Sequence, residues 1–221
     1  MATLAKELEA FRASLIGRVS RDLAATFARA EGELLASGAG QQAPREGDTA
    51  ADFILSDQQG RQVRLYTLLE QGPVLLVFYR GGWCPFCTIS LRAIQRVLPQ
   101  LRAHRAQVIG ISPELPAHAR ATVERNRLDF PLLHDTDNVV AGEWHLVQEL
   151  HPELRPLYER LGHAVPAMNG TRDWKLPIPA GFVIAPDRRI ILARVDPRLY
   201  VRMEPADAVA AVAALETARS L

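Results

Sequence analysis

The chain has 221 residues, 48% of them hydrophobic and 23% charged, with a formal net charge of +1. This composition is ordinary for a folded domain with a sizeable core, and the small net charge argues against nucleic acid or an anionic membrane as a partner. No apolar run approaches the roughly 20 residues of a membrane-spanning helix, and the first residues lack the pattern of a signal peptide. We therefore expect a globular protein of the cytoplasm, where thiols are kept reduced.

Residues 1–40 carry a single apolar stripe. Apolar side chains recur there every three or four residues, which predicts one long amphipathic helix: Leu4, Leu8, Phe11, Leu15, Val19, Leu23 and Phe27. The run from Ser37 to Gly40 ends this helix, and a polar linker continues to about Gly47. Such a stripe must be covered, either by the chain's own domain, which is the favoured interpretation, or by a second copy in a homodimer.

Residues 47–221 alternate between strand and helix patterns and are expected to form one domain. In chain order the expected elements are a hairpin of 53–55 and 63–65, a buried strand at 74–79, a helix at 84–101, a strand at 108–111, a helix to about 127, a strand at 130–133, helices at 137–147 and 152–162, a hairpin of 182–184 and 190–192, and a final helix at 205–219. Strands separated by helices indicate an α/β fold with a mixed sheet.

Two cysteines, Cys84 and Cys87, stand where a buried strand ends in a Gly-Gly turn and a helix begins. The free N–H groups at a helix start favour an anion, so the pKa of Cys84 is expected to lie below the usual value of about 8.5. Pro85 suits the first helical position, and Arg80 adds positive charge. Cys87 follows about one turn later, close enough for a disulfide. In a reducing compartment this spacing indicates a redox pair.

Structural zinc is the competing explanation for the C-x-x-C spacing. It would need two further ligands, and the six histidines are scattered without a paired spacing. We therefore expect neither a metal nor another cofactor.

The stretch FYRGGWCPFC, together with VIGISPELP, LDFPLLHD and the run from LPIPAGFVIAPDRR to MEP, resembles the alkyl hydroperoxide reductase/thiol-specific antioxidant family, the peroxiredoxins. The resemblance covers roughly residues 47–217 and points to a subgroup with a C-x-x-C pair. It implies a thioredoxin-like fold, in which helices flank a central mixed sheet, with an added N-terminal helix outside the resemblance.

The chain departs from the family's Pro-x-x-x-Thr-x-x-Cys box. When the chain is aligned with that box, Cys87 takes the place of the peroxidatic cysteine. Cys84 takes the place of the threonine, and Arg80 takes the place of the proline. The family's catalytic arginine falls at about Pro179. Arg194, on the second strand of the late hairpin, is a candidate replacement for that arginine.

Other features of the site resemble thioredoxins and glutaredoxins. Trp83 matches the tryptophan of their W-C-x-x-C motif, and C-P-F-C is close to a glutaredoxin centre. Pro179 stands where thioredoxins keep a cis-proline that faces the disulfide. The residues expected to shape the site are thus Arg80, Trp83, Pro85 and Pro179.

Three functions follow as alternatives. The main expectation is a peroxidase in which Cys87 attacks the peroxide, Cys84 resolves, and a thioredoxin-like donor reduces the pair. The second is a thiol–disulfide oxidoreductase in which Cys84, at the helix start, attacks a substrate disulfide. The third is a non-enzymatic redox sensor or adaptor that binds a partner through the N-terminal helix.

Overall fold

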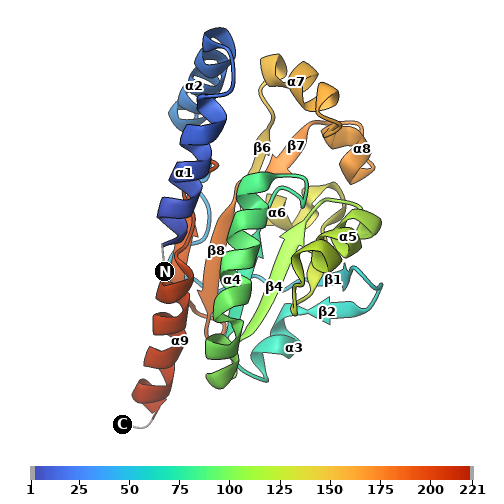
Figure 1. Ribbon diagram of the computed structural model, residues 1–221. Coiled ribbons are helices and arrows are strands. Elements are labelled where there is room, and N and C mark those ends of the chain that lie inside the picture. Colours follow the sequence, from blue (N-terminus) through green and yellow to red (C-terminus); the bar gives the residue numbers. More distant parts are fainter. Residues whose placement is uncertain (1–2, 220–221) are drawn as a thin grey trace.

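The structure is a computed structural model that describes residues 3–219 (Figure 1). Its first elements are two helices, α1 (Leu4–Ile16) and α2 (Arg21–Ala36), so the prediction of one long N-terminal helix is wrong. Gly17 caps the end of α1, and the Ser20 side chain accepts a hydrogen bond from the Leu23 N–H at 3.2 Å. A serine N-cap of this kind starts a new helix, so the apolar stripe is divided between two helices.

The remaining elements surround a mixed sheet, as expected. Its strands stand in the order β2-β1-β5-β4-β3-β8-β9, where the bounds are β1 (Ile54–Asp57), β2 (Gln62–Arg64), β3 (Val74–Phe78), β4 (Gln107–Ser112), β5 (Leu132–His134), β8 (Ala180–Ile184) and β9 (Ile190–Val195). The neighbours β3, β4 and β5 run parallel, and the other pairs run antiparallel. Both predicted hairpins are confirmed, because β1 pairs with β2 and β8 pairs with β9.

Helices cover both faces of this sheet (Figure 1). Every residue of β3 is buried, and its side chains alternate between two apolar clusters. Leu75 and Val77 belong to the cluster under α1, α4 (Pro85–Ala103), α5 (Pro116–Asn126) and α9 (Pro205–Arg219). The other three side chains of β3 face α3 (Leu65–Leu69) and α6 (Val139–Glu143). The strand that leads to the cysteines is thus fixed by apolar packing on both sides.

The segment between β5 and β8 differs from the prediction. The expected helices 137–147 and 152–162 are short and interrupted: this segment consists of the 3₁₀-helices η1 (Thr136–Asn138) and η2 (Pro152–Leu154), the helices α6, α7 (Arg155–Arg160) and α8 (Val165–Asn169), and the strands β6 (Val147–Glu149) and β7 (Lys175–Pro177). His145 adopts a left-handed φ of 53° just before β6. β6 pairs antiparallel with β7, a partner far along the chain, which overrides the local helical pattern.

The N-terminal helices pack on the chain's own domain, which was the favoured interpretation of their stripe. Leu4 and Leu8 of α1 are buried in the cluster with α4 and α9. Leu23 and Phe27 of α2 pack against the cluster that contains Leu154. None of the helices within residues 3–219 is both long and apolar enough to cross a membrane.

Candidate functional site

The two cysteines lie at the strand–turn–helix junction that the sequence predicts. β3 ends at Phe78, the turn passes through Gly81 with a φ of 146°, and Cys84 is the N-cap of α4, so Pro85 is the first helical residue as expected. Both cysteines are free thiols, and Cys84 is 2% exposed and Cys87 1% exposed. A buried, unbridged pair one helical turn apart is thus placed for disulfide chemistry.

The two thiols have different acidities. A hydrogen bond from Cys87 is the main cause that lowers the pKa of Cys84 to about 5, and the charge of Arg80 adds to this against the opposing effect of burial. Burial and the neighbouring Cys84 instead raise the pKa of Cys87. In the reduced pair, Cys84 is therefore the thiolate at neutral pH and Cys87 is the thiol that donates to it.

Arg80 and Trp83, both expected to shape the site, lie together beside the cysteines. Arg80 is only 2% exposed, and its Nη2 donates to the Tyr158 hydroxyl at 3.0 Å. Its guanidinium lies 5.1 Å from the centroid of the Trp83 ring, and its backbone N–H donates to Cys87 Sγ at 3.5 Å. Trp83 in turn stacks on His163 and meets Tyr158 edge-on. Arg80 is thus a buried charge held by aromatic rings next to the thiolate.

Arg202 is a second cation of the site, and it was not predicted from the sequence. It lies between β9 and α9, and its Nη1 donates to the backbone oxygens of Arg198 and Val201 at 3.0 and 2.7 Å. Its charge lowers the pKa of both cysteines, and within the part of the chain that the structure describes its buried Nη2 has no hydrogen-bond partner. Arg194, the candidate replacement arginine, is exposed and is not among the groups with the largest effects on the pKa of either thiol. No local motif marks Arg202.

A buried carboxylate supports the turn before Cys84. Glu114 is 1% exposed and accepts the Tyr79 hydroxyl at 2.7 Å and the Gly82 N–H at 2.8 Å. Burial raises the pKa of Glu114. A Cβ on Gly82 would lie 1.7 Å from Thr122 Oγ1, so the turn requires glycine at this position. Glu114 and Gly82 therefore fix the direction in which the chain enters α4.

Pro179 does not form the cis-proline that the thioredoxin resemblance implies. The Ile178–Pro179 bond is trans, and these two residues link β7 to β8. The pair Phe78–Ala180 places Pro179 next to the end of β3. Pro179 is buried, and the Ile178 N–H already donates to the Leu146 carbonyl at 2.5 Å. This N–H is therefore not available to a substrate peptide.

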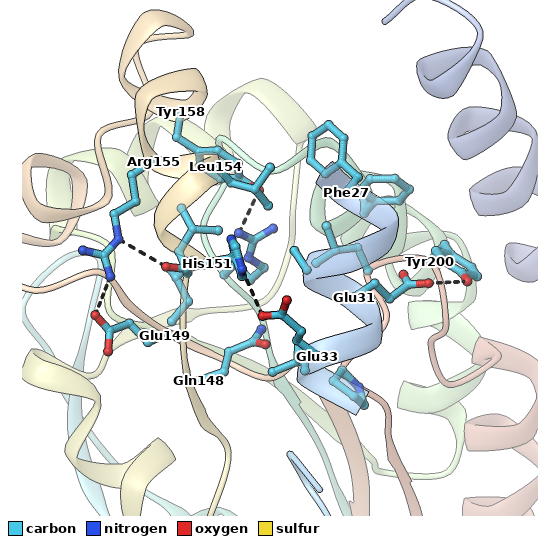
Figure 2. Close-up of a pocket in the computed structure, with 18 of the residues that line it drawn as sticks. Phe27, Glu31, Glu33, Gln148, Glu149, His151, Leu154, Arg155, Tyr158 and Tyr200 are labelled. Carbon is cyan, nitrogen blue, oxygen red and sulfur yellow. Dashed lines mark hydrogen bonds and ion pairs between the residues drawn. The ribbon is translucent and has the colours of Figure 1, made fainter. Parts of the chain in front are cut away.

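A cavity of about 410 Å³ lies between the N-terminal helices and the β6–α7 segment (Figure 2). Arg80 and Phe86 belong to its wall, although neither cysteine does. Figure 2 shows polar contacts from α2 to both sides of the cavity. Glu33 lies within hydrogen-bond distance of His151, and Glu31 accepts a hydrogen bond from the Tyr200 hydroxyl. The cavity thus reaches the redox centre through the arginine that supports it.

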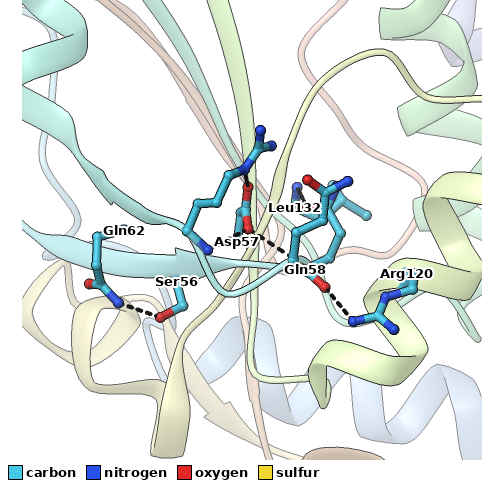
Figure 3. A network of polar contacts seen from close by, with 8 residues as sticks. Ser56, Asp57, Gln58, Gln62, Arg120 and Leu132 are labelled. Atoms are coloured by element: carbon cyan, nitrogen blue, oxygen red, sulfur yellow. Dashed lines mark hydrogen bonds and ion pairs between the residues drawn. The ribbon is translucent and has the colours of Figure 1, made fainter.

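A separate polar network lies at the β1–β2 hairpin (Figure 3). Asp57 is 1% exposed and accepts hydrogen bonds from Gln59 and Arg61. Gln58 accepts from the Leu132 N–H at 3.0 Å and, through its carbonyl, from Arg120 at 3.2 Å. Because the groups of this network satisfy one another, it ties the hairpin to β5 and α5. Among the described residues, no group of three or more His, Cys, Asp or Glu side chains is placed to hold a metal ion.

Comparison with known proteins agrees with this architecture. The model of the AhpC/TSA family matches residues 46–193. A putative peroxiredoxin of Mycobacterium tuberculosis is 35% identical over 113 residues, which cover 51% of this chain and 73% of that protein. Peroxiredoxin Bcp of Escherichia coli is 33% identical over 100 residues, which cover 45% of this chain and 64% of that protein.

Solved structures share the fold. The crystal structure of peroxidoxin BcpB from Mycobacterium tuberculosis superposes with a TM-score of 0.61 at 28% identity and covers 77% of this chain and 97% of that chain. Peroxiredoxin Q of Xanthomonas campestris, at 19% identity and a TM-score of 0.55, covers 75% of this chain and 90% of that chain. From the family match, the shared fold and the junction that carries the cysteines, we conclude that this chain belongs to the AhpC/TSA family and is a peroxiredoxin-like protein with a thioredoxin-like fold.

Proposed function

We propose that the protein is a thiol-dependent peroxidase that reduces a peroxide by a dithiol–disulfide cycle of Cys84 and Cys87. The carrying observation is the Cys84 thiolate, with a pKa near 5, hydrogen-bonded to a thiol one turn away in a chain of the AhpC/TSA family. The thiolate is the reactive form of cysteine. Its position at the N-terminus of α4, near the charges of the buried Arg80 and the half-buried Arg202, supports an attack on a polarisable O–O bond.

The proposed cycle uses only the two cysteines and an external donor. The Cys84 thiolate attacks the terminal peroxide oxygen, the O–O bond breaks, and the leaving oxygen takes a proton and departs as an alcohol or water. The Cys84 sulfenic acid then condenses with the Cys87 thiol, which releases water and forms the disulfide. A thioredoxin-like dithiol donor returns two electrons and two protons. The cycle needs no cofactor, and the reducing cytoplasm that we propose as its location would keep the resting pair as a dithiol.

This order of attack differs from the order that the family's box implies. On that box Cys87 would attack and Cys84 would resolve. The raised pKa of Cys87 and the lowered pKa of Cys84 favour the opposite roles. Both sulfurs are almost fully buried, so the first turn of α4 has to open locally before the thiol of a donor protein can reach the disulfide.

Thiol–disulfide exchange is the second candidate, and the W-C-P-F-C sequence with its acidic first cysteine favours it. One feature opposes it: the Ile178 N–H already donates to the Leu146 carbonyl, so it is not free to pair with a substrate peptide. The sensor or adaptor alternative would need the N-terminal stripe for a partner. That stripe is already packed on the chain's own domain.

Single cysteine variants test the proposal. In a peroxide-consumption assay with a thioredoxin or dithiothreitol donor, we expect Cys84→Ser to abolish turnover, because this substitution removes the sulfur that attacks the peroxide. Cys87→Ser should still form one sulfenic acid per chain, measured by a sulfenic-acid probe and mass spectrometry. Ser90→Ala, a buried position in the same helix, is the matched control and should keep turnover.

Three results would change the assignment. A sulfenic acid that forms on Cys87 in the Cys84→Ser variant would restore the order of the family's box. Fast reduction of protein disulfides, together with a wild-type protein that barely reacts with peroxide, would support the oxidoreductase. Loss of neither activity in either variant would exclude both enzymatic functions.

A further inference from the structure

The cavity beside α2 has the size and lining of a small-molecule site. Its volume of about 410 Å³ lies within the range of roughly 300–1,000 Å³ that such sites occupy. The walls that α1, α2 and the β6–α7 segment supply are largely apolar and include Leu15, Phe27, Ala30, Leu34, Leu154 and Leu176. The first four belong to helices that precede the segment matched to the family, 46–193. This cavity is therefore built in part by an addition to the family fold.

The same cavity contains one deeply buried cation. Arg80 is 2% exposed; among the described residues its side chain donates to the Tyr158 hydroxyl, and its Nε has no hydrogen-bond partner. Among the described side chains, no carboxylate pairs with Arg80. In the dithiol form the Cys84 thiolate balances this charge, whereas in the disulfide form the buried charge is left without a counter-charge, which is costly. An apolar cavity that ends at such a guanidinium fits a ligand with an apolar chain and an anionic head.

The carboxylates at the rim of the cavity are already engaged with other partners. Each makes a contact within hydrogen-bond distance: Glu31 with Tyr200 at 3.2 Å, Glu33 with His151 at 3.1 Å and Glu149 with Arg155 at 2.6 Å. None of them pairs with Arg80. An incoming anionic head would therefore not have to displace an existing carboxylate from this guanidinium.

The charge that faces Arg80 depends on the redox state of the pair. In the dithiol form, Arg80 and the Cys84 thiolate stabilise each other. In a disulfide both sulfurs are neutral, so Arg80 loses this counter-charge. A carboxylate at Arg80 would replace the lost charge in the disulfide form and would compete with the thiolate in the dithiol form.

We propose that this cavity binds a carboxylic acid with one unbranched apolar chain, its carboxylate at Arg80, and that the disulfide form binds it more tightly than the dithiol form. The inference rests on one part of the proposed function, which is that Cys84 and Cys87 can form a disulfide. Coupling between two sites is reciprocal. The bound acid therefore disfavours reduction of the disulfide by the same factor by which the disulfide form binds the acid more tightly. The cavity thus couples binding of an aliphatic carboxylate to the redox state of the enzyme.

Binding of decanoate to the intact protein tests this inference. The two redox forms are prepared with dithiothreitol and with diamide, which makes the disulfide without peroxide. Binding is followed by calorimetry and by tryptophan fluorescence, to which Trp83 contributes from its contact with Tyr158 of the cavity wall. We expect saturable binding that is at least about fivefold tighter to the disulfide form. Acetate, which lacks the chain, and decanol, which lacks the charge, should each bind at least about tenfold more weakly, a difference of about 1.4 kcal/mol.

Two variants with a matched control locate the site. Ala30→Phe fills the cavity and should weaken decanoate binding to both forms at least about tenfold, whereas Ala28→Phe, exposed on the same helix, should bind like wild type. Arg80→Met should remove the preference for decanoate over decanol. Ala30→Phe keeps the test valid if Arg80→Met does not fold.

The inference is overturned by equal affinity of decanoate for the two forms, by an Ala30→Phe variant that binds like wild type, or by a pair that diamide does not convert to a disulfide. Absent peroxide turnover with intact, redox-dependent decanoate binding would instead refute the proposed function alone.

Discussion

At the scale of single residues, the two cysteines differ because their surroundings differ. Cys84 caps α4, accepts the hydrogen bond of Cys87 and faces Arg80, whereas Cys87 is dominated by burial. The sequence predicted the junction, the helix start and the role of Arg80, since all three depend on neighbours within a few positions. It did not predict Arg202, which reaches the pair from the far end of the chain.

The acidity of Cys84 gives the first prediction. Because the pKa of Cys84 is lowered to about 5, its thiolate persists above that pH and is lost as the pH falls through it. Thiolate absorbance and alkylation rate should therefore show one step with a midpoint near pH 5. In Cys87→Ala the step should move to higher pH, because the largest cause of the lowered pKa is removed.

Cys84→Ala is the control for this titration and should abolish the step. A step that persists in Cys84→Ala and disappears in Cys87→Ala would show that the thiolate is on Cys87.

At the scale of elements, the N-terminal helices show how tertiary contacts refine a correct pattern. The stripe predicted from spacing is real, but Gly17 and the Ser20 cap divide it into α1 and α2. α1 is also held at its start, where the Glu204 carboxylate accepts the backbone N–H groups of Leu4 and Ala5 at 3.0 and 2.7 Å. This contact joins the two ends of the chain, and no local signal predicts it.

The docking of α1 gives a prediction for stability. Leu8 is fully buried against α4 and α9, so Leu8→Ala should lower the free energy of unfolding by about 2–5 kcal/mol. Leu35→Ala, at a position that is 44% exposed on α2, should change it by less than about 0.5 kcal/mol. Urea unfolding followed by circular dichroism measures both values. Equal effects of the two substitutions would mean that α1 is not docked in solution.

At the scale of the whole molecule, apolar clusters on both faces hold the sheet in place. The added N-terminal helix α1 packs on one of these two clusters. The division of the chain into 1–40 and 47–221 stays a prediction, but α1 and α2 share the core of the second part. A homodimer through these helices would have to use their outward face. Leu35 is a large hydrophobic side chain exposed on α2 outside the cavity lining, whereas Ile16 borders the cavity.

Sedimentation tests the oligomeric state. We expect the reduced protein to sediment as a monomer at micromolar concentration, because the stripe that would drive association is already covered within the chain. A dimer that Leu35→Glu dissociates, while Ala28→Glu on the same helix does not, would instead support the homodimer through the N-terminal helices.

The sequence by itself determined the cysteine pair, the strand–turn–helix that presents it, the two hairpins and the mixed sheet. Each of these signals lies within a few residues, where turn glycines, apolar periodicity and helix starts act locally. The tertiary structure decided what depends on distant segments: Arg202 beside the cysteines, the trans bond at Pro179, the pairing of β6 with β7, and the cavity that ends at Arg80. Such features arise because the packing of the whole chain, rather than the preference of one segment, sets where each charge and backbone edge is buried.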